Sequence, residues 1–338
     1  MRLIVFSCLL AVSSFNHAWA QDAVQATELA SVGPISDMDA VVVSGVQPGP
    51  GMWKVSKGDH VMWVLGTQSP LPKKMEWVSR EVEQAVAQSQ EVIWAPWFGV
   101  HVKAGVFQAI TLMPKLLGVR KNPGGATLQE VVPAEMYARW RLLKADYIGG
   151  DRGIENWRPI FAAMELWDEA IDDSGLTQKG AVGAVISRIA KQHKLKQTRL
   201  SSILVVKDAK AALNEFRASK LDDLDCFGKT MLRLETDLIA MKARANAWAI
   251  GDIEALRGLP YTDQSAACER AAMQAGVVQK RLDRDLDAEL ERKWFDAAEK
   301  ALANNTATFA LLPMAELLKA DGYLAKLQAK GYVVEAPE

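Results

Sequence analysis

Residues 52–72 read MWKVSKGDHVMWVLGTQSPLP, and this stretch decides the predicted fold. Two runs rich in Val and Trp, 52–55 and 60–65, predict β-strands, and the Gly-Asp pair between them is typical of a tight hairpin turn. After the loop Gly66–Pro72, Ser79 is placed to cap a helix. Open α/β sheets bind ligands at loops that leave the carboxyl end of a strand before a helix. The loop Gly66–Pro72 is therefore the first candidate site.

The C-terminal part of the chain repeats this alternation. Thr306–Leu312 predicts a strand, Met314–Lys330 a helix broken near Asp321, and Tyr332–Glu335 a last strand. Between the two parts the sequence is mainly helical. We therefore predict an α/β (α+β) fold, in which two βαβ-like halves form one central sheet with a large helical insertion between them. The loops Gly66–Pro72 and Pro313–Glu316 should then lie near each other.

The predicted boundaries follow from this pattern. A single domain covers 51–338, divided into a first β/α half, a mainly helical insertion and a second β/α half: 51–96, 97–303 and 304–338.

Several helices can be placed in the insertion. Val100–Leu117 is largely apolar, and Thr127 and Glu130 have the spacing of a capping box. Leu221–Ile250 is the longest candidate, because its apolar residues alternate steps of three and four. That pattern fits a coiled-coil seam between two copies or a long helix packed within its own domain, and we favour the second because one such helix is present.

The N-terminus indicates an exported protein. Residues 1–20 combine Arg2, an apolar run and small residues before Gln21, which predicts a signal peptide cleaved after Ala20. Residues 21–50 form a lead-in segment, and no later stretch is apolar enough to span a membrane. The net charge of −1 favours no nucleic-acid partner. We expect a periplasmic or secreted bacterial protein.

Export affects the interpretation of the cysteines. Only Cys226 and Cys268 remain after cleavage, and such a pair in an oxidising compartment predicts a disulfide, with two buried free thiols as the alternative. The remaining histidines, His60, His101 and His193, are far apart in the sequence and show no metal-binding spacing.

Three stretches of the chain resemble the TraB/GumN family, which includes the Tiki-type metalloproteases. They are residues 52–91, residues 244–259 (RANAWAIGDIEALRGL) and residues 291–335, and the helical middle is a looser match. The resemblance implies a metalloprotease-like fold. Active members are expected to carry two G-x-x-H motifs and an acid that together hold a divalent metal with an open position for water.

The chain departs from that pattern at each ligand position. The first motif keeps Gly66 but has Ser69 in place of histidine, and the second has Pro313 and Glu316 in place of glycine and histidine. Ala95 or its neighbours stand where the acid is expected. Serine is a poor ligand for a divalent metal. We therefore predict a protein that keeps the fold without the protease chemistry.

One matching residue remains. Arg292 resembles the arginine that family members place ahead of the second motif. We include it among the candidate binding residues, with Gly66, Thr67, Gln68, Ser69, Lys73 and Glu316.

Each candidate also has a purely structural interpretation. The loop with Thr67, Gln68, Ser69 and Lys73 either binds a ligand or is a turn stiffened by two prolines. Ser69 could also be a nucleophile with Lys73 as its base. Glu316 is either a remaining ligand or acid, or an ordinary residue of the first turn of a helix.

The tryptophans leave a similar choice. Trp94 and Trp97, on either side of Pro96, either form an aromatic wall for a ligand or pack in the core.

Two functions follow. The first is a non-catalytic, regulatory or binding protein for a peptide, a protein or an envelope component, with no cofactor. The second is a metal-dependent peptidase or hydrolase that holds Mn, Co or Zn with a rearranged ligand set, drawn from Glu316, Asp321, and His101 or His193.

Overall fold

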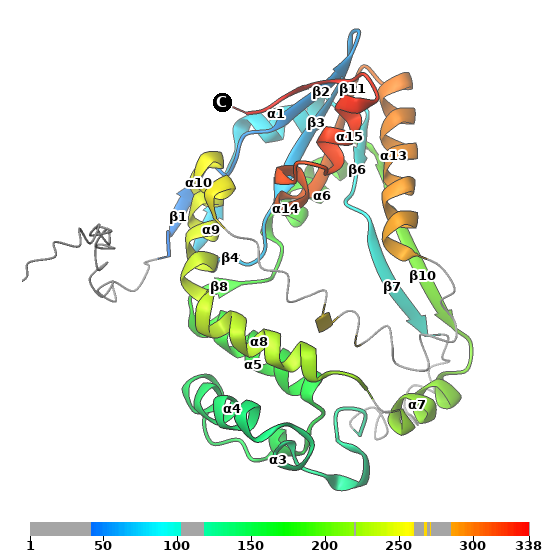
Figure 1. Ribbon diagram of the computed structural model, residues 1–338. Coiled ribbons are helices and arrows are strands. Elements are labelled where there is room, and N and C mark those ends of the chain that lie inside the picture. Colours follow the sequence, from blue (N-terminus) through cyan, green and yellow to red (C-terminus); the bar gives the residue numbers. More distant parts are fainter. Residues whose placement is uncertain are drawn as a thin grey trace, which may run out of the picture. The chain divides into compact units, whose positions relative to one another are not determined.

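A six-stranded mixed sheet forms the centre of the fold in the computed structural model, which describes residues 42–102, 118–219, 221–259, 267, 268, 271 and 285–337 (Figure 1). The predicted signal peptide, most of the lead-in segment and residues 103–117 of the predicted helix Val100–Leu117 lie outside the described residues. The strand order of the sheet is β12 (Val333–Glu335), β2 (Trp53–Lys57), β3 (His60–Thr67), β11 (Ala307–Pro313), β6 (Glu91–Ile93) and β9 (Lys196–Thr198).

The two predicted halves meet at the centre of this sheet. β2 and β3 form the antiparallel hairpin predicted from the sequence, and Gly58 takes a φ of 63° in its turn. β11, from the C-terminal half, lies parallel to both β3 and β6. The predicted α/β fold with one central sheet is confirmed.

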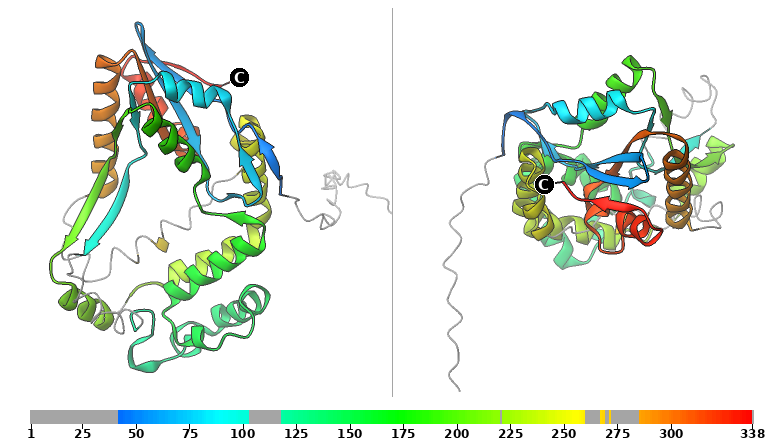
Figure 2. Two further views of the ribbon diagram at one scale, coloured as in Figure 1. Left: turned by 180° about the vertical axis from the view of Figure 1, so that it is seen from behind. Right: turned by 90° about the horizontal axis from the view of Figure 1, so that it is seen from above.

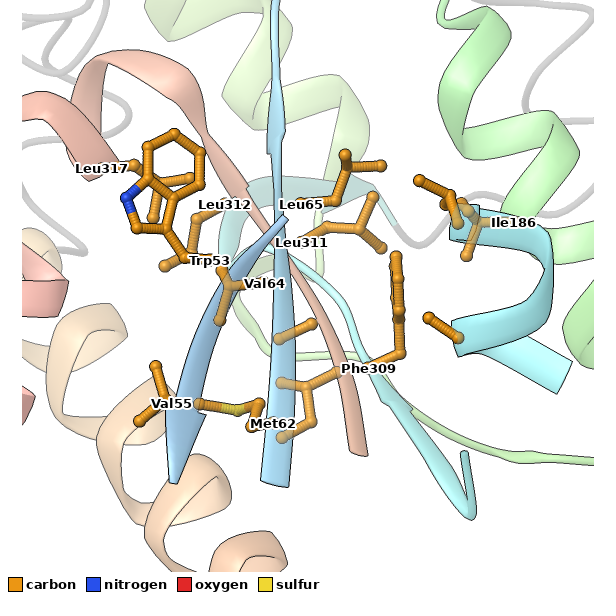
Figure 3. Packing of buried hydrophobic residues seen from close by; sticks show 14 of the residues in the cluster. Trp53, Val55, Met62, Val64, Leu65, Ile186, Phe309, Leu311, Leu312 and Leu317 are labelled. Carbon is orange, nitrogen blue, oxygen red and sulfur yellow. The ribbon is translucent and has the colours of Figure 1, made fainter. Parts of the chain in front are cut away.

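Helices cover both faces of the sheet. α1 (Arg80–Gln88) and α6 (Ala181–Gln192) pack on one face, whereas α13 (Leu286–Asn304), α14 (Met314–Leu318) and α15 (Tyr323–Ala329) pack on the other. Figure 3 shows this division within the core: Leu65 and Leu311 point toward Ile186 of α6, and Leu312 and Trp53 toward Leu317 of α14. Successive side chains of a strand point to opposite faces of the sheet, so each buried strand contributes apolar side chains to the cores on both faces.

The helical insertion has its own hydrophobic core. Its elements are α3 (Leu128–Val131), α4 (Ala134–Tyr147), α5 (Pro159–Asp173), α7 (Ala209–Ala218), α8 (Leu224–Thr236), α9 (Leu238–Ile250) and α10 (Ile253–Gly258), with short 3₁₀ turns at Pro123–Gly125 and Gly153–Asn156. The capping box of Thr127 and Glu130 is confirmed at the start of α3. The predicted disulfide is also confirmed, because Cys226 in α8 is bonded to Cys268.

The predicted long helix Leu221–Ile250 is interrupted. Asp237 ends α8 and precedes α9, and its carboxylate accepts hydrogen bonds from Arg233 and Arg244. The apolar residues of the pattern, such as Phe227 and Met231, are buried within the chain itself. These contacts agree with the prediction that the pattern packs within its own domain.

Two strands extend the sheet into a narrow ribbon. β7 (Trp97–Val102) continues after β6, β10 (Ser201–Val206) continues after β9, and the two pair in parallel (Figure 2). The helix predicted from Val100 is therefore wrong for residues 100–102, which belong to β7. An apolar run without clear periodicity does not distinguish a helix from a buried strand.

Short strands connect the first loop to other parts of the chain. β4 (Leu71–Pro72) pairs with β8 (Leu176–Thr177) of the insertion, and β1 (Gly45–Gln47) pairs with β5 (Met75–Trp77). The loop Gly66–Pro72 is thus held by the insertion on one side and by the sheet on the other.

Candidate functional site

The two loops predicted to be neighbours start side by side. In the register of β3 and β11, Gly66 lies opposite Leu312 and Thr67 lies opposite Pro313. The hydroxyl of Thr67 donates to the carbonyl of Leu312 at 3.2 Å. Parallel strands bring their carboxyl ends to the same edge of a sheet, where ligands bind in α/β proteins.

The surroundings of Gly66 leave little room for a side chain at this junction. A Cβ at position 66 would lie 2.5 Å from Cε of Met314 and 3.1 Å from Cδ1 of Leu317. The missing side chain therefore lets α14 of the second half pack directly against the end of β3. On the other side, the indole N–H of Trp248 in α9 donates to the carbonyl oxygen of Gly66 at 2.8 Å.

A pocket of about 560 Å³ opens at this edge, and we call it the strand-end pocket. The first loop contributes Thr67, Gln68 and Ser69, and the second contributes Pro313, Met314 and Ala315. Its wall includes Trp94, Ala95 and Trp97 from the segment after β6. Three positions singled out by the sequence motifs, those of Ser69, Ala95 and Pro313, thus line one pocket. A volume of this size suits a small molecule or a short segment of a polymer.

The charge of the strand-end pocket is positive. Lys179, Arg199, Arg233 and Arg244 line it, and the described lining residues include no carboxylate and no imidazole. Lys179 follows β8 and Arg199 follows β9, whereas the other two come from α8 and α9. The sequence analysis named none of these four as site residues. Only Arg244 had a signal, since it begins the 244–259 run that resembles the family.

The two arginines from α8 and α9 share one buried carboxylate. Nη1 and Nη2 of Arg244 lie 3.1 and 2.7 Å from the two carboxylate oxygens of Asp237. Nε of Arg233 lies 3.2 Å from Oδ2 of the same residue. A carboxylate between two guanidiniums leaves a net positive charge, and the fork geometry fixes Arg244 in place.

Arg199 is oriented by an aromatic ring. Its guanidinium lies 4.4 Å from the ring centroid of Trp94, and its Nη2 donates to Oε1 of Gln197 at 3.3 Å. Trp97, by contrast, is 51% exposed. The sequence left open whether Trp94 and Trp97 line a ligand site or pack in the core. Both line the strand-end pocket, and Trp94 also packs against the hydrophobic core.

Glu316 lies apart from the strand-end pocket. Its carboxylate pairs with Lys319 and lines a second pocket of about 760 Å³, together with Asp285, Asp287, Glu291 and Asp321. α14 buries Met314 and Leu317, three residues apart, so Glu316 lies on another side of the helix. Burial, together with the nearby carboxylates of Glu291 and Glu316, raises the pKa of Tyr323 in this second pocket to about 12.

The other predicted candidates also lie elsewhere. Arg292 is exposed on α13 and pairs with Asp296 at 3.0 Å. Lys73 lies outside the strand-end pocket, with its ammonium 2.6 Å from Oδ2 of Asp172.

The histidines considered as metal ligands lie elsewhere in the fold: His193 caps the C-terminus of α6, and His101 lies in β7. Within the described ranges, no three His, Cys, Asp or Glu residues form a group that could hold a metal ion.

Comparison with known proteins supplies the evolutionary context. The profile of the TraB/PrgY/gumN family matches residues 51–336, which is most of the chain. The chain belongs to this family. No curated protein and no solved structure gave a significant match. The resemblance stated from the motifs is confirmed at the level of the family.

None of the helices in the described part of this family member is both long enough and apolar enough to cross a membrane.

Proposed function

We propose that this chain is a non-catalytic member of the TraB/PrgY/gumN family that binds a peptide, a protein or another envelope component in the strand-end pocket. One observation carries the proposal. The pocket lies where the two motif-bearing loops meet, and the residues at its motif positions are Ser69, Ala95 and Pro313, none of which is a typical metal ligand. This lining supports a site that keeps its position in the fold and uses other chemistry.

The electrostatics of the pocket support binding without a metal. A divalent cation is held by neutral imidazoles and carboxylates, and the described lining residues supply neither. Lys179 and Arg199 would repel such an ion, and the repulsion grows as water is excluded from the pocket. The residues of the strand-end pocket therefore do not fit a catalytic metal of the family type, and we derive no hydrolytic step from it.

The pocket is suited to holding a polar ligand by other means. The hydroxyls and the amide of Thr67, Ser69 and Gln68 can donate and accept hydrogen bonds, and the tryptophans provide apolar contact area. Ser69 is exposed, so a ligand can reach its hydroxyl. We assign these three residues to the binding loop.

The second candidate function is a metal-dependent peptidase or hydrolase. One observation favours it, namely that Glu316 and Asp321 line the same second pocket with other acidic side chains. The ammonium groups of Lys319 and Lys326 also line that pocket, and Lys319 pairs with Glu316. The charge there is thus partly balanced by the protein itself.

Metal content and peptidase activity separate the two candidates. We would measure Mn, Co and Zn in the purified protein by mass spectrometry and assay it against a fluorogenic peptide library. Binding without catalysis predicts substoichiometric metal and no turnover. Stoichiometric metal with turnover abolished by Glu316→Ala, but not by the matched change Glu81→Ala on α1, would refute the proposal.

We also propose that the protein is exported to the periplasm or beyond. Support comes from the basic start, the apolar run and the small residues before Gln21. Mass spectrometry of the protein from the cell envelope should give a mature N-terminus at Gln21. A chain that keeps Met1 and fractionates with the cytoplasm would contradict export.

A further inference from the structure

The cations of the strand-end pocket differ in how they are paired. Arg233 and Arg244 both contact the carboxylate of Asp237. Lys179 and Arg199 have no carboxylate within ion-pair distance in the described ranges of the chain. Among the described residues, these two cations have no carboxylate partner and the pocket lining holds no acid, which makes a favourable environment for an anion.

Arg199 is held in a geometry that suits anion binding. Its guanidinium stacks on Trp94, which restricts the rotation of the side chain. One edge of the group is used by the hydrogen bond to Gln197, and a guanidinium has five N–H donors in a rigid fork. A carboxylate or phosphate matches that fork with two parallel hydrogen bonds. The stacking therefore pre-organises Arg199 for such a group.

Trp97 provides a flat apolar surface in the same pocket. An ideal Cβ at position 99 would lie 2.2 Å from Cζ3 of Trp97, so the indole ring rests directly on Gly99. The ring is seated on the strand and is still 51% exposed. An exposed indole that lies against the strand backbone is a good stacking partner for a ring or for the apolar face of a sugar.

We propose that the strand-end pocket binds a small anion attached to a ring or other flat apolar group. Arg199 and Lys179 hold the carboxylate or phosphate, and the ring lies on Trp97. This inference rests on the proposed function, because it names the ligand class of the same pocket. The pocket volume of about 560 Å³ is large enough for a ligand of this kind.

A matched set of probes tests the anion and the ring separately. Benzoate and phenyl phosphate carry both groups, acetate and inorganic phosphate carry the anion alone, and benzyl alcohol carries the ring alone. Binding to the purified full-length protein would be measured by saturation-transfer NMR and by titration of tryptophan fluorescence. We expect benzoate or phenyl phosphate to bind most tightly, and its affinity to fall as salt is raised. The carboxylate and phosphate arms show which anion the pocket prefers.

Variants assign the two roles. Arg199→Gln should weaken binding of phenyl phosphate or benzoate about tenfold or more, because charged hydrogen bonds are lost. Lys179→Gln should weaken it by a smaller factor. Arg257→Gln is the matched control, since this exposed arginine pairs with Glu254 and does not line the pocket.

Gly99→Ala, which displaces the indole of Trp97, should weaken the binding of the ring-bearing anions and leave the binding of inorganic phosphate unchanged. Trp97→Ala provides the same test at an exposed side chain.

The outcomes are distinct. Neutral rings that bind as tightly as ring-bearing anions would overturn the anion class, while binding in the pocket, and with it the proposed function, would stand. Unchanged affinity in Arg199→Gln and Lys179→Gln, with melting curves like the wild type, would also overturn it. So would the failure of every anion to bind at millimolar concentration. Metal-dependent turnover, by contrast, would refute the proposed function itself.

Discussion

Trp248 and Gly66 are joined by a hydrogen bond although 182 residues separate them in the sequence. The buried indole N–H of Trp248 donates to the carbonyl oxygen of Gly66 at 2.8 Å, at the point where β3 ends and the first loop begins. The helical insertion is therefore more than an addition to the sheet. It fixes the backbone of the loop that forms one side of the strand-end pocket.

Replacing Trp248 by Phe should destabilise the protein through the lost donor. The carbonyl of Gly66 would remain buried without this partner, which costs about 1–3 kcal/mol beyond the lost volume. Trp294→Phe is the matched control, since Trp294 is fully buried but its Nε1 has no hydrogen-bond partner among the described residues. Denaturant unfolding at neutral pH measures the difference. Equal destabilisation by the two changes would show that the hydrogen bond contributes nothing.

Asp237→Ala should be among the most destabilising single changes in the insertion. It leaves the 1% exposed guanidinium of Arg244 without the carboxylate that holds it, and such losses cost about 3–5 kcal/mol. Asp296→Ala removes an exposed partner of Arg292 and should cost about 1 kcal/mol or less. Urea unfolding curves compare the two. A similar midpoint for both variants would contradict the structural role assigned to Asp237.

Glu91 should make folding stability depend on pH. Burial raises the pKa of this carboxyl, but hydrogen bonds from Thr198, Lys196 and Asn305 outweigh that effect and lower the pKa below its ordinary value of 4.5. A depressed pKa in the folded state means that the stabilisation is present above the unfolded pKa and is lost as pH falls through the folded pKa. Glu91→Gln should therefore lose less stability than the wild type between about pH 5 and pH 3. The free energy of unfolding across that range tests it, with the exposed Glu81→Gln as control. Parallel curves for wild type and Glu91→Gln would contradict it.

The Cys226–Cys268 bond should contribute substantially to stability. It closes a loop with a sequence separation of 42 residues, and bridges of this kind typically contribute about 2–4 kcal/mol. Reduced wild type and the double change to Ser should show the same loss in chemical denaturation. Thiol titration of unfolded, unreduced protein should find no free cysteine if the leader with Cys8 has been removed, and one if it remains. Two further thiols would disprove the bridge.

Short sequence patterns correctly predicted the local features whose geometry is set by a few neighbouring residues. The turn at Gly58 and the capping box of Thr127 and Glu130 each follow from a short pattern with a direct physical cause. The interruption between α8 and α9 at Asp237 was not predicted. The apolar spacing continues across this position, and the carboxylate of Asp237 forms a buried ion pair that the spacing does not reveal. The strand at residues 100–102 was predicted as a helix, because the apolar residues there show no clear periodicity.

Of the residues that line the strand-end pocket, sequence analysis singled out those next to the motifs, such as Ser69 and Ala95, which follow β3 and β6. Their role in binding stays a prediction. Arg199 and Lys179 could not be found in that way, since they come from distant connections that the fold brings to the same pocket. Glu316 lies outside the strand-end pocket because the apolar face of α14, not the motif spacing, decides which side chains turn inward.

A crystal structure with 4-bromobenzoate and MnCl₂ in the same soak would test the central claim most directly. The anomalous signals of bromine and manganese distinguish the two ligands at one site. We predict a bromine peak over Trp97, with the carboxylate facing Arg199 and Lys179. A manganese peak beside Ser69, with no bromine in the strand-end pocket, would contradict the account.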